Sequence, residues 1–504
     1  MSNTKTFIFG RKARAAVLSL VAALVAFGAT PAAGQAVPAR TAAGSGNVAA
    51  PQLPGTQFSY AAVVSRVAPA VVTVRSERRV ARNAQEFPFL DDPQFREFFG
   101  QRTPRGGEPR PRTERQRGLG SGVIVSADGY ILTNHHVVEG SSDIRVELND
   151  RRTMTARLVG SDEPSDLAVL KVEATGLPVL TLGDSDRVQV GDVVLAVGNP
   201  LGIGQTVTSG IISAKGRQTG LSDGSFEDFL QTDASINRGN SGGALVNTQG
   251  ELIGINSQIL SPSGVSIGIG FAIPSNMARD VMGQLVKVGR VRRGMVGVRI
   301  QPVDAEIAAA LGLADVRGAL VSEVTPDSPA ARAGLKRGDV ILNFNGTSVA
   351  DSNAFRNAVA RTQPGTQVTL TILRGGREQQ LRVTLAELPV ETSREGSEGG
   401  EPSTGANDTG RLGATVEPVT PETAARLELP RDARGLLVTR VNPEGSAADA
   451  GLRRGDLIQE VNQQPVTTPE QLRTALAGAG DRPVLLLVQR GGATSYIPLR
   501  PRKQ

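Results

Sequence analysis

Short apolar stretches separated by turn residues recur through the middle of the chain. In residues 123–134, two such stretches flank Asp128-Gly129, a dipeptide typical of a β-hairpin turn. Residues 144–160 repeat this plan around Asn149-Asp150, and further apolar runs lie at residues 166–172, 192–200, 206–213, 244–255 and 268–274. Short strands at this spacing predict a β-barrel or β-sandwich. Residues 277–289 instead have helical spacing and end at Gly289, a typical helix stop.

The C-terminal part of the chain contains an internal repeat. Residues 318–346 and 435–463 are identical at 15 of 29 positions, at a constant offset of 117 residues. Each copy continues into a segment of helical spacing and then into two strands that flank an Arg-Gly-Gly turn. Two copies at so long a period indicate a duplicated domain, because stacked solenoids have shorter and more numerous repeats.

The first 36 residues have the pattern of an export signal. Four basic residues up to Arg14 precede an apolar run at residues 15–27, and small residues follow as far as Ala36. A membrane span needs about 20 apolar residues, so we expect cleavage near Ala36. An uncleaved membrane anchor is the alternative. No later stretch is apolar enough to span a bilayer, so we expect no stable membrane span once the signal is removed.

Composition narrows the class of protein. The chain of 504 residues is 39% hydrophobic and has 59 Gly, 30 Pro and no Trp, which favours turn-rich β domains over helical bundles. It has no Cys, which excludes disulfides, thiolate metal sites and a cysteine nucleophile. Export without cysteine fits a bacterial periplasm, because the fold does not depend on oxidation. The only two His residues are adjacent, so we expect no metal site and no cofactor.

The net charge of +6 is concentrated in the export signal. Residues 37–504 carry 51 basic and 49 acidic residues, a net charge of +2, so we expect no nucleic acid partner. A long irregular insert at residues 77–118 is rich in Arg, Pro and Gly. We predict a solvated mobile loop there, although its basic run leaves an anionic partner as an alternative.

One serine stands in a setting suited to catalysis. Ser241 lies in Arg-Gly-Asn-Ser-Gly-Gly at residues 238–243. Glycines on both sides allow backbone N–H groups to converge. Such groups stabilise the oxyanion that forms when a serine attacks a carbonyl. On this string alone, an ordinary Gly-rich β-turn remains the alternative.

The order of the polar residues adds to this signal. Both histidines, His135 and His136, precede Ser241, which excludes the order used by α/β-hydrolases. The order His, Asp, Ser is that of the double-barrel serine proteases. Asp166 begins the apolar run at residues 166–172 and is the candidate third member. A plain strand-edge cap is the alternative for Asp166.

With these motifs in view, the chain resembles the HtrA/DegP family of trypsin-like serine proteases with C-terminal PDZ domains. The resemblance covers residues 60–503. The matching motifs are TNHHVV (133–138), SDLAVLKV (165–172), TDASINRGNSGGALVNTQGELIGIN (232–256), GIGFAIPSNM (268–277), AGLKRGDVI (333–341) and AGLRRGDLI (450–458). It implies a mainly β fold, in which a chymotrypsin-like double β-barrel precedes two PDZ domains.

The resemblance also implies a division of the chain. The expected parts are a signal peptide at 1–36, a flexible segment at 37–57, a protease domain at 58–290 with the long loop 77–118, a first PDZ domain at 291–390, a linker at 391–410 and a second PDZ domain at 411–503.

The resemblance places the reaction on three residues. His136 would act as general base, Asp166 would orient it, and Ser241 would be the nucleophile. This chain has His135 where the family motif usually has another residue, so His135 is the alternative acting ring. The backbone amides of Gly239 and Ser241, with Asn240 between them, would form the oxyanion hole.

Carried over by the same resemblance, three residues would line the primary specificity pocket: Ile236, Ile259 and Leu260. The pocket would contain no acid, so we expect cleavage after small aliphatic residues instead of Lys or Arg. Ordinary core positions are the alternative for these three residues. The peptide-carboxylate loops of the PDZ domains would be Met295, Val296, Gly297 and Val298 in the first, and Leu412, Gly413 and Ala414 in the second. Phe355 and Leu472 would line side-chain pockets or lie in the core.

The implied function is an ATP-independent serine endoprotease that degrades misfolded or damaged exported proteins. Its partners would be unfolded proteins or peptides, and the PDZ domains would bind substrate segments or C-termini. Additional chaperone activity is expected from the resemblance, as is a homotrimer or a larger homo-oligomer. A holdase with its protease site kept off, or a peptide-binding scaffold, are the alternatives.

Overall fold

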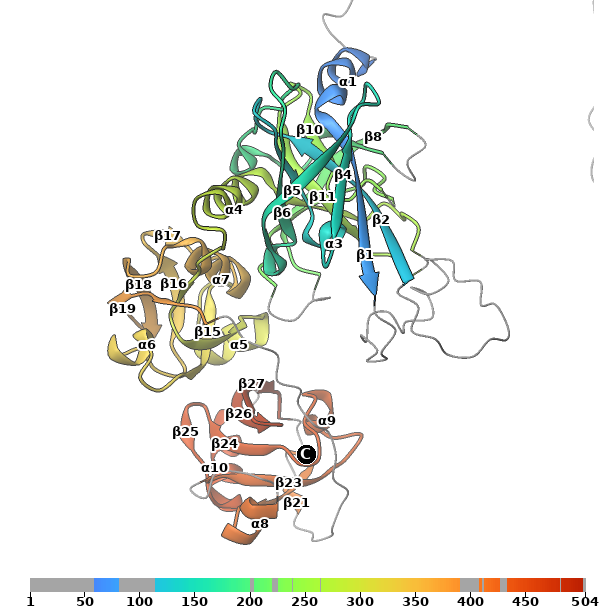
Figure 1. Cartoon of the computed structure of the whole chain (residues 1–504). Coiled ribbons are helices and arrows are strands. Elements are labelled where there is room, and N and C mark those ends of the chain that lie inside the picture. Colours follow the sequence, from blue (N-terminus) through green and yellow to red (C-terminus); the bar gives the residue numbers. More distant parts are fainter. Residues whose placement is uncertain are drawn as a thin grey trace, which may run out of the picture. The chain divides into compact units, whose positions relative to one another are not determined.

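The computed structural model describes residues 59–80, 114–199, 204–219, 225–237, 239–262, 264–389, 408–409, 412–426, 433–480 and 482–501. The expected signal at 1–36 and flexible segment at 37–57 lie outside the described residues. Strands dominate the described residues, and they form two closed six-stranded barrels followed by three further sheets (Figure 1). The predicted mainly β fold with a double β-barrel is therefore confirmed. In this part of the chain, no helix is both long and apolar enough to cross a membrane.

The first barrel has the strand order β1-β2-β3-β6-β5-β4. Its elements, with the short helices that precede or interrupt it, are α1 (Ala61–Val67), η1 (Ala68–Ala70), β1 (Val71–Val80), β2 (Glu114–Ile124), β3 (Tyr130–Thr133), α3 (His135–Val138), β4 (Asp143–Glu147), β5 (Thr153–Asp162), η2 (Glu163–Ser165) and β6 (Leu167–Val172). The loop expected at 77–118 overlaps β1 and β2, because Glu77 to Val80 pair with Arg117 to Glu114. Residues 81–113 of that expected loop lie outside the described residues.

The second barrel has the strand order β10-β11-β12-β9-β8-β7. Its elements are η3 (Ser185–Arg187), β7 (Val193–Gly198), β8 (Thr206–Arg217), β9 (Phe229–Thr232), β10 (Ala244–Asn247), β11 (Leu252–Ile259) and β12 (Gly270–Pro274). Helix α4 (Ser275–Val288) follows and ends at Gly289, whose φ of 75° is the left-handed conformation that glycine adopts most easily. The predicted helix at 277–289 is thus confirmed to within two residues.

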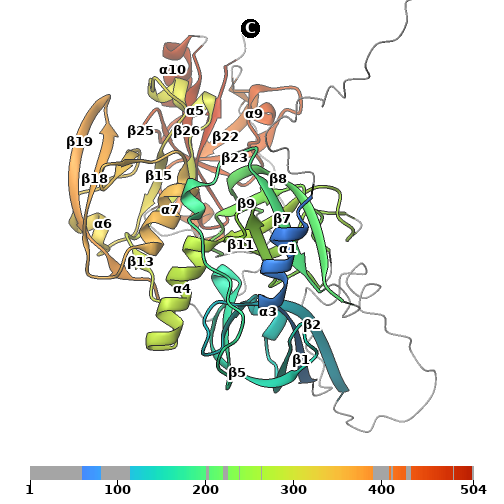
Figure 2. The ribbon, with the colours of Figure 1, turned by 90° about the horizontal axis from the view of Figure 1, so that it is seen from above.

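The two barrels lie side by side and share a core (Figure 2). Strand β6 explains why the run LAVLKV is apolar nearly throughout. Successive strand residues point to opposite faces. Leu167 and Val169 pack in the core shared with the second barrel, whereas Ala168 and Leu170 fill the interior of the first barrel. Both faces of β6 are therefore buried, and the strand that follows Asp166 is held firmly.

The chain continues into two smaller sheets, and a separate two-stranded sheet of β13 and β20 belongs with the first. The elements of the first are β13 (Gly294–Met295), β14 (Val298–Pro302), α5 (Ala305–Leu311), β15 (Ala319–Val324), α6 (Pro329–Arg332), β16 (Val340–Phe344), β17 (Thr347–Ser348), α7 (Ser352–Arg361), β18 (Gln367–Arg374), β19 (Arg377–Thr384) and β20 (Ala386–Glu387). Those of the second are β21 (Asp408–Thr409), β22 (Ala414–Pro418), α8 (Pro421–Arg426), β23 (Leu436–Val441), α9 (Ser446–Asp449), β24 (Leu457–Val461), β25 (Gln464–Pro465), α10 (Pro469–Ala479), β26 (Val484–Arg490) and β27 (Ala493–Leu499).

The repeated Arg-Gly-Asp sequence has the same structural role in both small sheets. Asp339 and Asp456 are each 1% exposed. Asp339 accepts two hydrogen bonds from the Arg374 guanidinium, and Asp456 accepts two from Arg490. Both arginines come from the Arg-Gly-Gly turns of the repeat. Each buried carboxylate is therefore paired with a cation, as burial requires.

Candidate active site

Asp166 is held at the end of a tight turn. Helix η2 begins after Asp162, whose Oδ2 accepts hydrogen bonds from the backbone N–H of Ser165 at 3.1 Å and from its hydroxyl at 2.5 Å. Asp166 follows with φ 53° and ψ 39°, a left-handed conformation that Asp adopts more readily than most residues. The turn directs the Asp166 carboxylate toward the residues that follow β3.

The carboxylate of Asp166 binds His136 from two directions. His136 Nδ1 lies 2.9 Å from Asp166 Oδ1 and 3.0 Å from Oδ2, and the backbone N–H of His136 donates to Oδ1 at 3.1 Å. The Asp166 carbonyl also accepts from the backbone N–H of His135 at 3.1 Å and from Asn134 Nδ2 at 3.0 Å. A carboxylate at Nδ1 places the proton of the neutral ring there and leaves Nε2 as an acceptor.

The contacts of Asp166 distinguish the two histidines. Its carboxylate contacts the ring of His136, whereas His135 Nδ1 is buried and has no hydrogen-bond partner among the described residues. Both histidines lie on the short helix α3, because β3 ends at Thr133. Consecutive residues on a helix point about 100° apart, so the two rings face different directions.

The surroundings shift both titratable groups. Burial lowers the pKa of His136, but the charge of Asp166, its hydrogen bond and the charge of Glu139 outweigh burial and raise that pKa above 6.5. Burial raises the pKa of Asp166, but the charge and hydrogen bonds of His136 and the hydroxyl of Ser257 outweigh it and hold that pKa below its usual range. The pair therefore favours an imidazolium beside a carboxylate.

Ser257 connects Ser241 to this pair, and the sequence interpretation missed it. Ser241 Oγ donates to the Ser257 carbonyl at 2.9 Å, and Ser257 Oγ donates to Asp166 Oδ2 at 2.7 Å. Ser257 lies on β11, 91 residues from Asp166. It follows directly after one of the motifs quoted above, but no local pattern marks it.

The loop that carries Ser241 makes close backbone contacts. Gly239 and Gly242 have φ of 90° and 82°. A Cβ on Gly242 would lie 2.1 Å from the Ser121 carbonyl oxygen, so only glycine fits there. The carbonyl of Asn240 accepts a hydrogen bond from the Gly243 N–H at 2.8 Å, and the Asn240 N–H donates one to the backbone carbonyl of Asn237 at 3.0 Å. The loop is therefore tightly folded by its own backbone.

Comparisons with known proteins identify the family. The trypsin-like peptidase domain matches residues 120–255, and PDZ domains match residues 294–385 and 437–490. The probable periplasmic serine endoprotease DegP-like of Chlamydia trachomatis serovar D is 43% identical over 454 residues, covering 88% of each chain. The chain belongs to the DegP-like periplasmic serine endoproteases.

Other relatives agree with this family. The probable periplasmic serine endoprotease DegP-like of Brucella suis biovar 1 is 41% identical over 476 residues, covering 88% of this chain and 90% of its own. The solved structure of the HtrA-type protease AlgW with decapeptide is 48% identical, with a TM-score of 0.52, and covers 66% of this chain and 100% of its own. The solved structure of the HtrA-type protease AlgW with tripeptide is 44% identical, with a TM-score of 0.54, and it covers 66% of this chain and 98% of its own.

The family, the enzyme class, the PDZ domains and the periplasmic location predicted from the sequence are thus confirmed. The two small sheets of this DegP-like endoprotease are those that the PDZ domains match.

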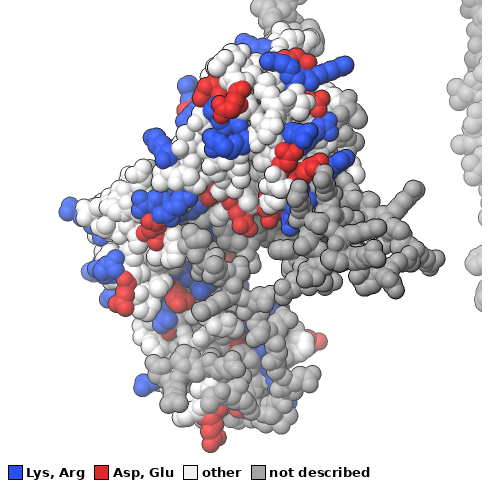
Figure 3. Space-filling model, viewed as in Figure 1, with Lys and Arg blue, Asp and Glu red and all other residues white. Residues whose placement is uncertain are grey.

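Basic and acidic side chains are interspersed over the face shown in Figure 3.

The three expected pocket residues do not share one environment. Ile236 is 1% exposed and belongs to the interior of the second barrel, and Ile259 packs against the same cluster. A Cβ on Gly270 would lie 2.9 Å from Ile236 Cδ1, so the isoleucine fills the space above that glycine. Leu260 is instead 44% exposed. The structure brings Ile236 and Ile259 together and leaves Leu260 at the surface.

The two expected carboxylate loops of the PDZ domains match each other bond for bond. Val296 O accepts from the N–H of Ala330, and Leu412 O accepts from that of Ala447. Gly297 and Gly413 have φ of 81° and 69°. The Gly297 carbonyl accepts a hydrogen bond from the first backbone N–H after β15, and the Gly413 carbonyl accepts one from the first backbone N–H after β23. Both loops therefore lie where a strand is about to begin. Phe355 and Leu472 are 2% and 0% exposed and belong to the PDZ cores.

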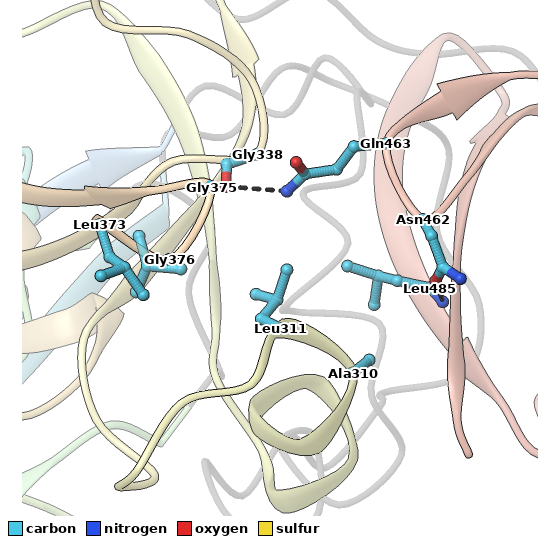
Figure 4. Close-up of a pocket in the computed structure, with 10 residues that line it drawn as sticks. Ala310, Leu311, Gly338, Leu373, Gly375, Gly376, Asn462, Gln463 and Leu485 are labelled. Atoms are coloured by element: carbon cyan, nitrogen blue, oxygen red, sulfur yellow. Dashed lines mark hydrogen bonds between the residues drawn. The ribbon is translucent and has the colours of Figure 1, made fainter. Parts of the chain in front are cut away.

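A cavity among the described residues contains none of the expected catalytic residues. It has a volume of about 200 Å³. Its lining is Ala310, Leu311, Gly338, Val340, Leu373, Gly375, Gly376, Asn462, Gln463 and Leu485, and Gln463 Nε2 donates to the Gly338 carbonyl at 3.2 Å (Figure 4). This lining has no titratable side chain, so cavity size does not identify the reactive site of this protein.

Proposed function

We propose that His136, Asp166 and Ser241 form the catalytic triad of this endoprotease. The observation that carries the proposal is the double contact of the Asp166 carboxylate with the ring and backbone of His136. A carboxylate at Nδ1 fixes the tautomer that accepts a proton at Nε2, and it stabilises the imidazolium that follows. The chain order and the glycine-flanked Ser241 support the same assignment.

The reaction is acyl transfer in two halves. His136 Nε2 takes the proton of Ser241 Oγ while Oγ attacks the peptide carbonyl carbon, and the carbonyl oxygen becomes an oxyanion. The imidazolium then protonates the leaving amine as the C–N bond breaks. Water, deprotonated by His136, hydrolyses the acyl-enzyme. In the present conformation Ser241 Oγ donates to the Ser257 carbonyl, so that hydrogen bond is exchanged for one to His136 before attack.

The oxyanion would bind to the backbone N–H groups of Gly239 and Ser241, with Asn240 between them. Loss of one such donor costs about 3–4 kcal/mol of transition-state stabilisation. Ile236, Ile259 and Leu260 would line the primary pocket. No acid is among them, so cleavage should follow small aliphatic residues. None of these steps needs ATP, a metal or another cofactor.

The PDZ domains supply substrate binding in this proposal. A peptide C-terminus or segment would add a strand beside β14, with its carboxylate at Met295 to Val298. In the second PDZ domain β21 already pairs with β22, so a peptide would replace β21 there and place its carboxylate at Leu412 to Ala414. The related AlgW structures hold a decapeptide and a tripeptide.

Substrates would be misfolded or damaged exported proteins. The protein would also act as a chaperone, and it would assemble as a homotrimer or a larger homo-oligomer. We also propose that the protease domain spans residues 58–290 and that the two PDZ domains span residues 291–390 and 411–503.

Proteolysis of an unfolded protein tests the triad. The parent protein should degrade reduced casein without ATP, and mass spectrometry of the products should place small aliphatic residues before the cleaved bonds. Ser241→Ala should abolish cleavage while the circular dichroism spectrum stays unchanged. Cleavage by Ser241→Ala at the parental rate would refute the assignment.

The same variant separates the chaperone function from proteolysis. Ser241→Ala should still suppress the aggregation of a heat-denatured protein, as measured by light scattering. A parent protein that suppresses aggregation but never cleaves would instead favour the holdase alternative. Light scattering coupled to gel filtration measures the oligomer, and a monomer would refute the expected trimer.

A further inference from the structure

A fully buried serine joins the first barrel to the loop that carries Ser241. Ser121 lies on β2 and is 0% exposed. Its hydroxyl donates to the Gly239 carbonyl at 2.5 Å and accepts from the backbone N–H of Asn199 at 2.9 Å. Gly239 is 118 residues away along the chain. Asn199 directly follows β7, so one hydroxyl holds two segments of the second barrel.

The backbone of Ser121 contributes two more bonds at the same place. Its N–H donates to the Ser241 carbonyl at 2.8 Å, and its carbonyl accepts from Thr133 Oγ1 at 2.7 Å. The polar groups of both backbone and side chain are therefore occupied. The bonds to Gly239 and Ser241 restrain the loop on both sides of Asn240.

Close packing keeps water away from these bonds. A Cβ on Gly120 would lie 3.2 Å from the Ser241 carbonyl, and one on Gly242 would lie 2.1 Å from the Ser121 carbonyl. The backbone of β2 and the loop thus touch, with glycines on both sides of the contact. In such a site a lost hydrogen bond is not replaced by water, so the orientation of the Gly239 carbonyl depends on the Ser121 hydroxyl.

The restrained 239–240 peptide lies between the two peptide groups that carry the proposed oxyanion donors, Gly239 N–H and Ser241 N–H. In a trans peptide, C=O and N–H point in opposite directions. The 239–240 peptide is held at both ends, because its C=O accepts from Ser121 and its N–H donates to Asn237. The next peptide has its Asn240 C=O bound to the Gly243 N–H, so the Ser241 N–H points to the other side. With the 239–240 peptide held on one side of Asn240 and the 240–241 peptide held by Gly243 on the other, the Ser241 N–H keeps its direction.

We propose that Ser121 is a positioning residue for the oxyanion hole, and that it acts by fixing the 239–240 peptide. This inference rests on the proposed role of Gly239 and Ser241 as oxyanion donors. Ser121 does not touch the substrate in this scheme. It holds the donors of the second barrel against a strand of the first, so that they are oriented before the oxyanion forms.

The chain offers a closely matched control for the test. Ser275 is also 0% exposed, and its hydroxyl also donates to a glycine carbonyl, that of Gly183, at 3.0 Å. It makes none of the contacts described around Ser241. Ser121→Ala and Ser275→Ala therefore remove the same kind of buried bond, one at the site and one at the start of α4.

We expect both variants to lower Tm, Ser121→Ala by more because its hydroxyl makes two hydrogen bonds, and only Ser121→Ala to slow catalysis. With a chromogenic peptide, Ser121→Ala should lower kcat about 10- to 100-fold with KM nearly unchanged, because the donors act on the transition state. Affinity for a peptide boronate, whose adduct with Ser241 places an oxygen at the oxyanion site, should fall by a similar factor. The pH midpoint of kcat/KM should not move, since His136 and Asp166 are untouched.

Three outcomes would overturn the proposal: an unchanged kcat, a change confined to KM, or an equal loss of kcat in Ser275→Ala. If Ser121→Ala does not fold, Ser121→Cys keeps a weak donor at the same position, and its kcat should lie well below the parental value. A Ser121→Cys variant with parental kcat would also contradict the proposal. Parallel assays of Ser241→Ala keep the two proposals separate, because cleavage by that variant at the parental rate refutes the triad, whereas full activity in Ser121→Ala refutes only the positioning role.

Discussion

Ser257 Oγ donates a 2.7 Å hydrogen bond to Asp166 Oδ2. The Asp166 carboxylate thereby receives donors from three groups, namely the ring of His136, its backbone N–H and the Ser257 hydroxyl. Each donor favours the ionised carboxylate and lowers its pKa. The Ser257 carbonyl meanwhile accepts from Ser241 Oγ, so one residue of β11 contacts both ends of the proposed triad.

Replacement of this hydroxyl should weaken catalysis without abolishing it. In Ser257→Ala the carboxylate keeps both His136 donors but loses one hydrogen bond, so its pKa rises and it stabilises the imidazolium less. We expect kcat/KM on a peptide substrate to fall about 3- to 10-fold, which corresponds to the roughly 0.5–1.5 kcal/mol of one hydrogen bond. Ser275→Ala is again the control. Parental kcat/KM in Ser257→Ala would show that the bond has no part in catalysis.

The pKa shift of His136 predicts the pH dependence of cleavage. The ring must be neutral to accept the proton of Ser241, so kcat/KM should rise with pH through the pKa of His136. Because Asp166 and Glu139 raise that pKa despite the opposing effect of burial, the midpoint of the acid limb should lie above 6.5. A pH profile of kcat/KM measures it, and a midpoint below 6.5 would contradict the prediction.

Removal of the Asp166 charge should move this midpoint in a known direction. Asp166→Asn deletes the charge that raises the pKa of His136, so the remaining activity should have its acid limb at lower pH. The rate should fall on the order of 10⁴-fold, because the amide no longer fixes the reactive tautomer. A midpoint that stays in place, or moves to higher pH, would show that Asp166 does not set this pKa.

A buried ion pair supports the turn that ends at Asp166. Arg293 and Asp162 are only 10% and 7% exposed in their side chains and lie 2.5 Å apart at closest approach. Arg293→Ala leaves the Asp162 carboxylate buried without its cation, and we expect a loss of about 3–5 kcal/mol in unfolding free energy. In the control, Arg299→Ala breaks a pair whose side chains are 57% and 43% exposed, so the loss should stay below about 1 kcal/mol. Urea unfolding measures both, and equal losses would argue against the buried pair.

The positions that could be predicted from the sequence are those that a local pattern marks. Asp166 begins an apolar run, and Ser241 stands among glycines. Helix α3 was missed because four residues are too few for a helical period to appear. The β1 and β2 pairing inside the expected loop was missed because an Arg-rich stretch does not resemble a strand.

The supporting serines could not be predicted, for a different reason. Ser257 and Ser121 reach the site across the barrels, at separations of 91 and 118 residues from their partners. Nothing in the local sequence distinguishes either from the many exposed serines. The environment of Ile236 likewise depends on closure of the second barrel, since a pocket residue and a core residue have the same apolar pattern.

The glycines of the PDZ loops provide a last test, of peptide binding. Gly297 has φ 81°, and a Cβ there would lie 2.3 Å from Ser328 Cβ. Gly297→Ala should therefore displace the loop and weaken binding of a fluorescent C-terminal peptide by at least about tenfold in anisotropy titrations, here in a Ser241→Ala background. Gly346→Ala is the control, because its φ is also 81° but no atom lies within 4 Å of the added carbon. It should cost stability without a change in peptide affinity. Equal weakening in both variants would mean that backbone strain, and not the carboxylate loop, accounts for the loss.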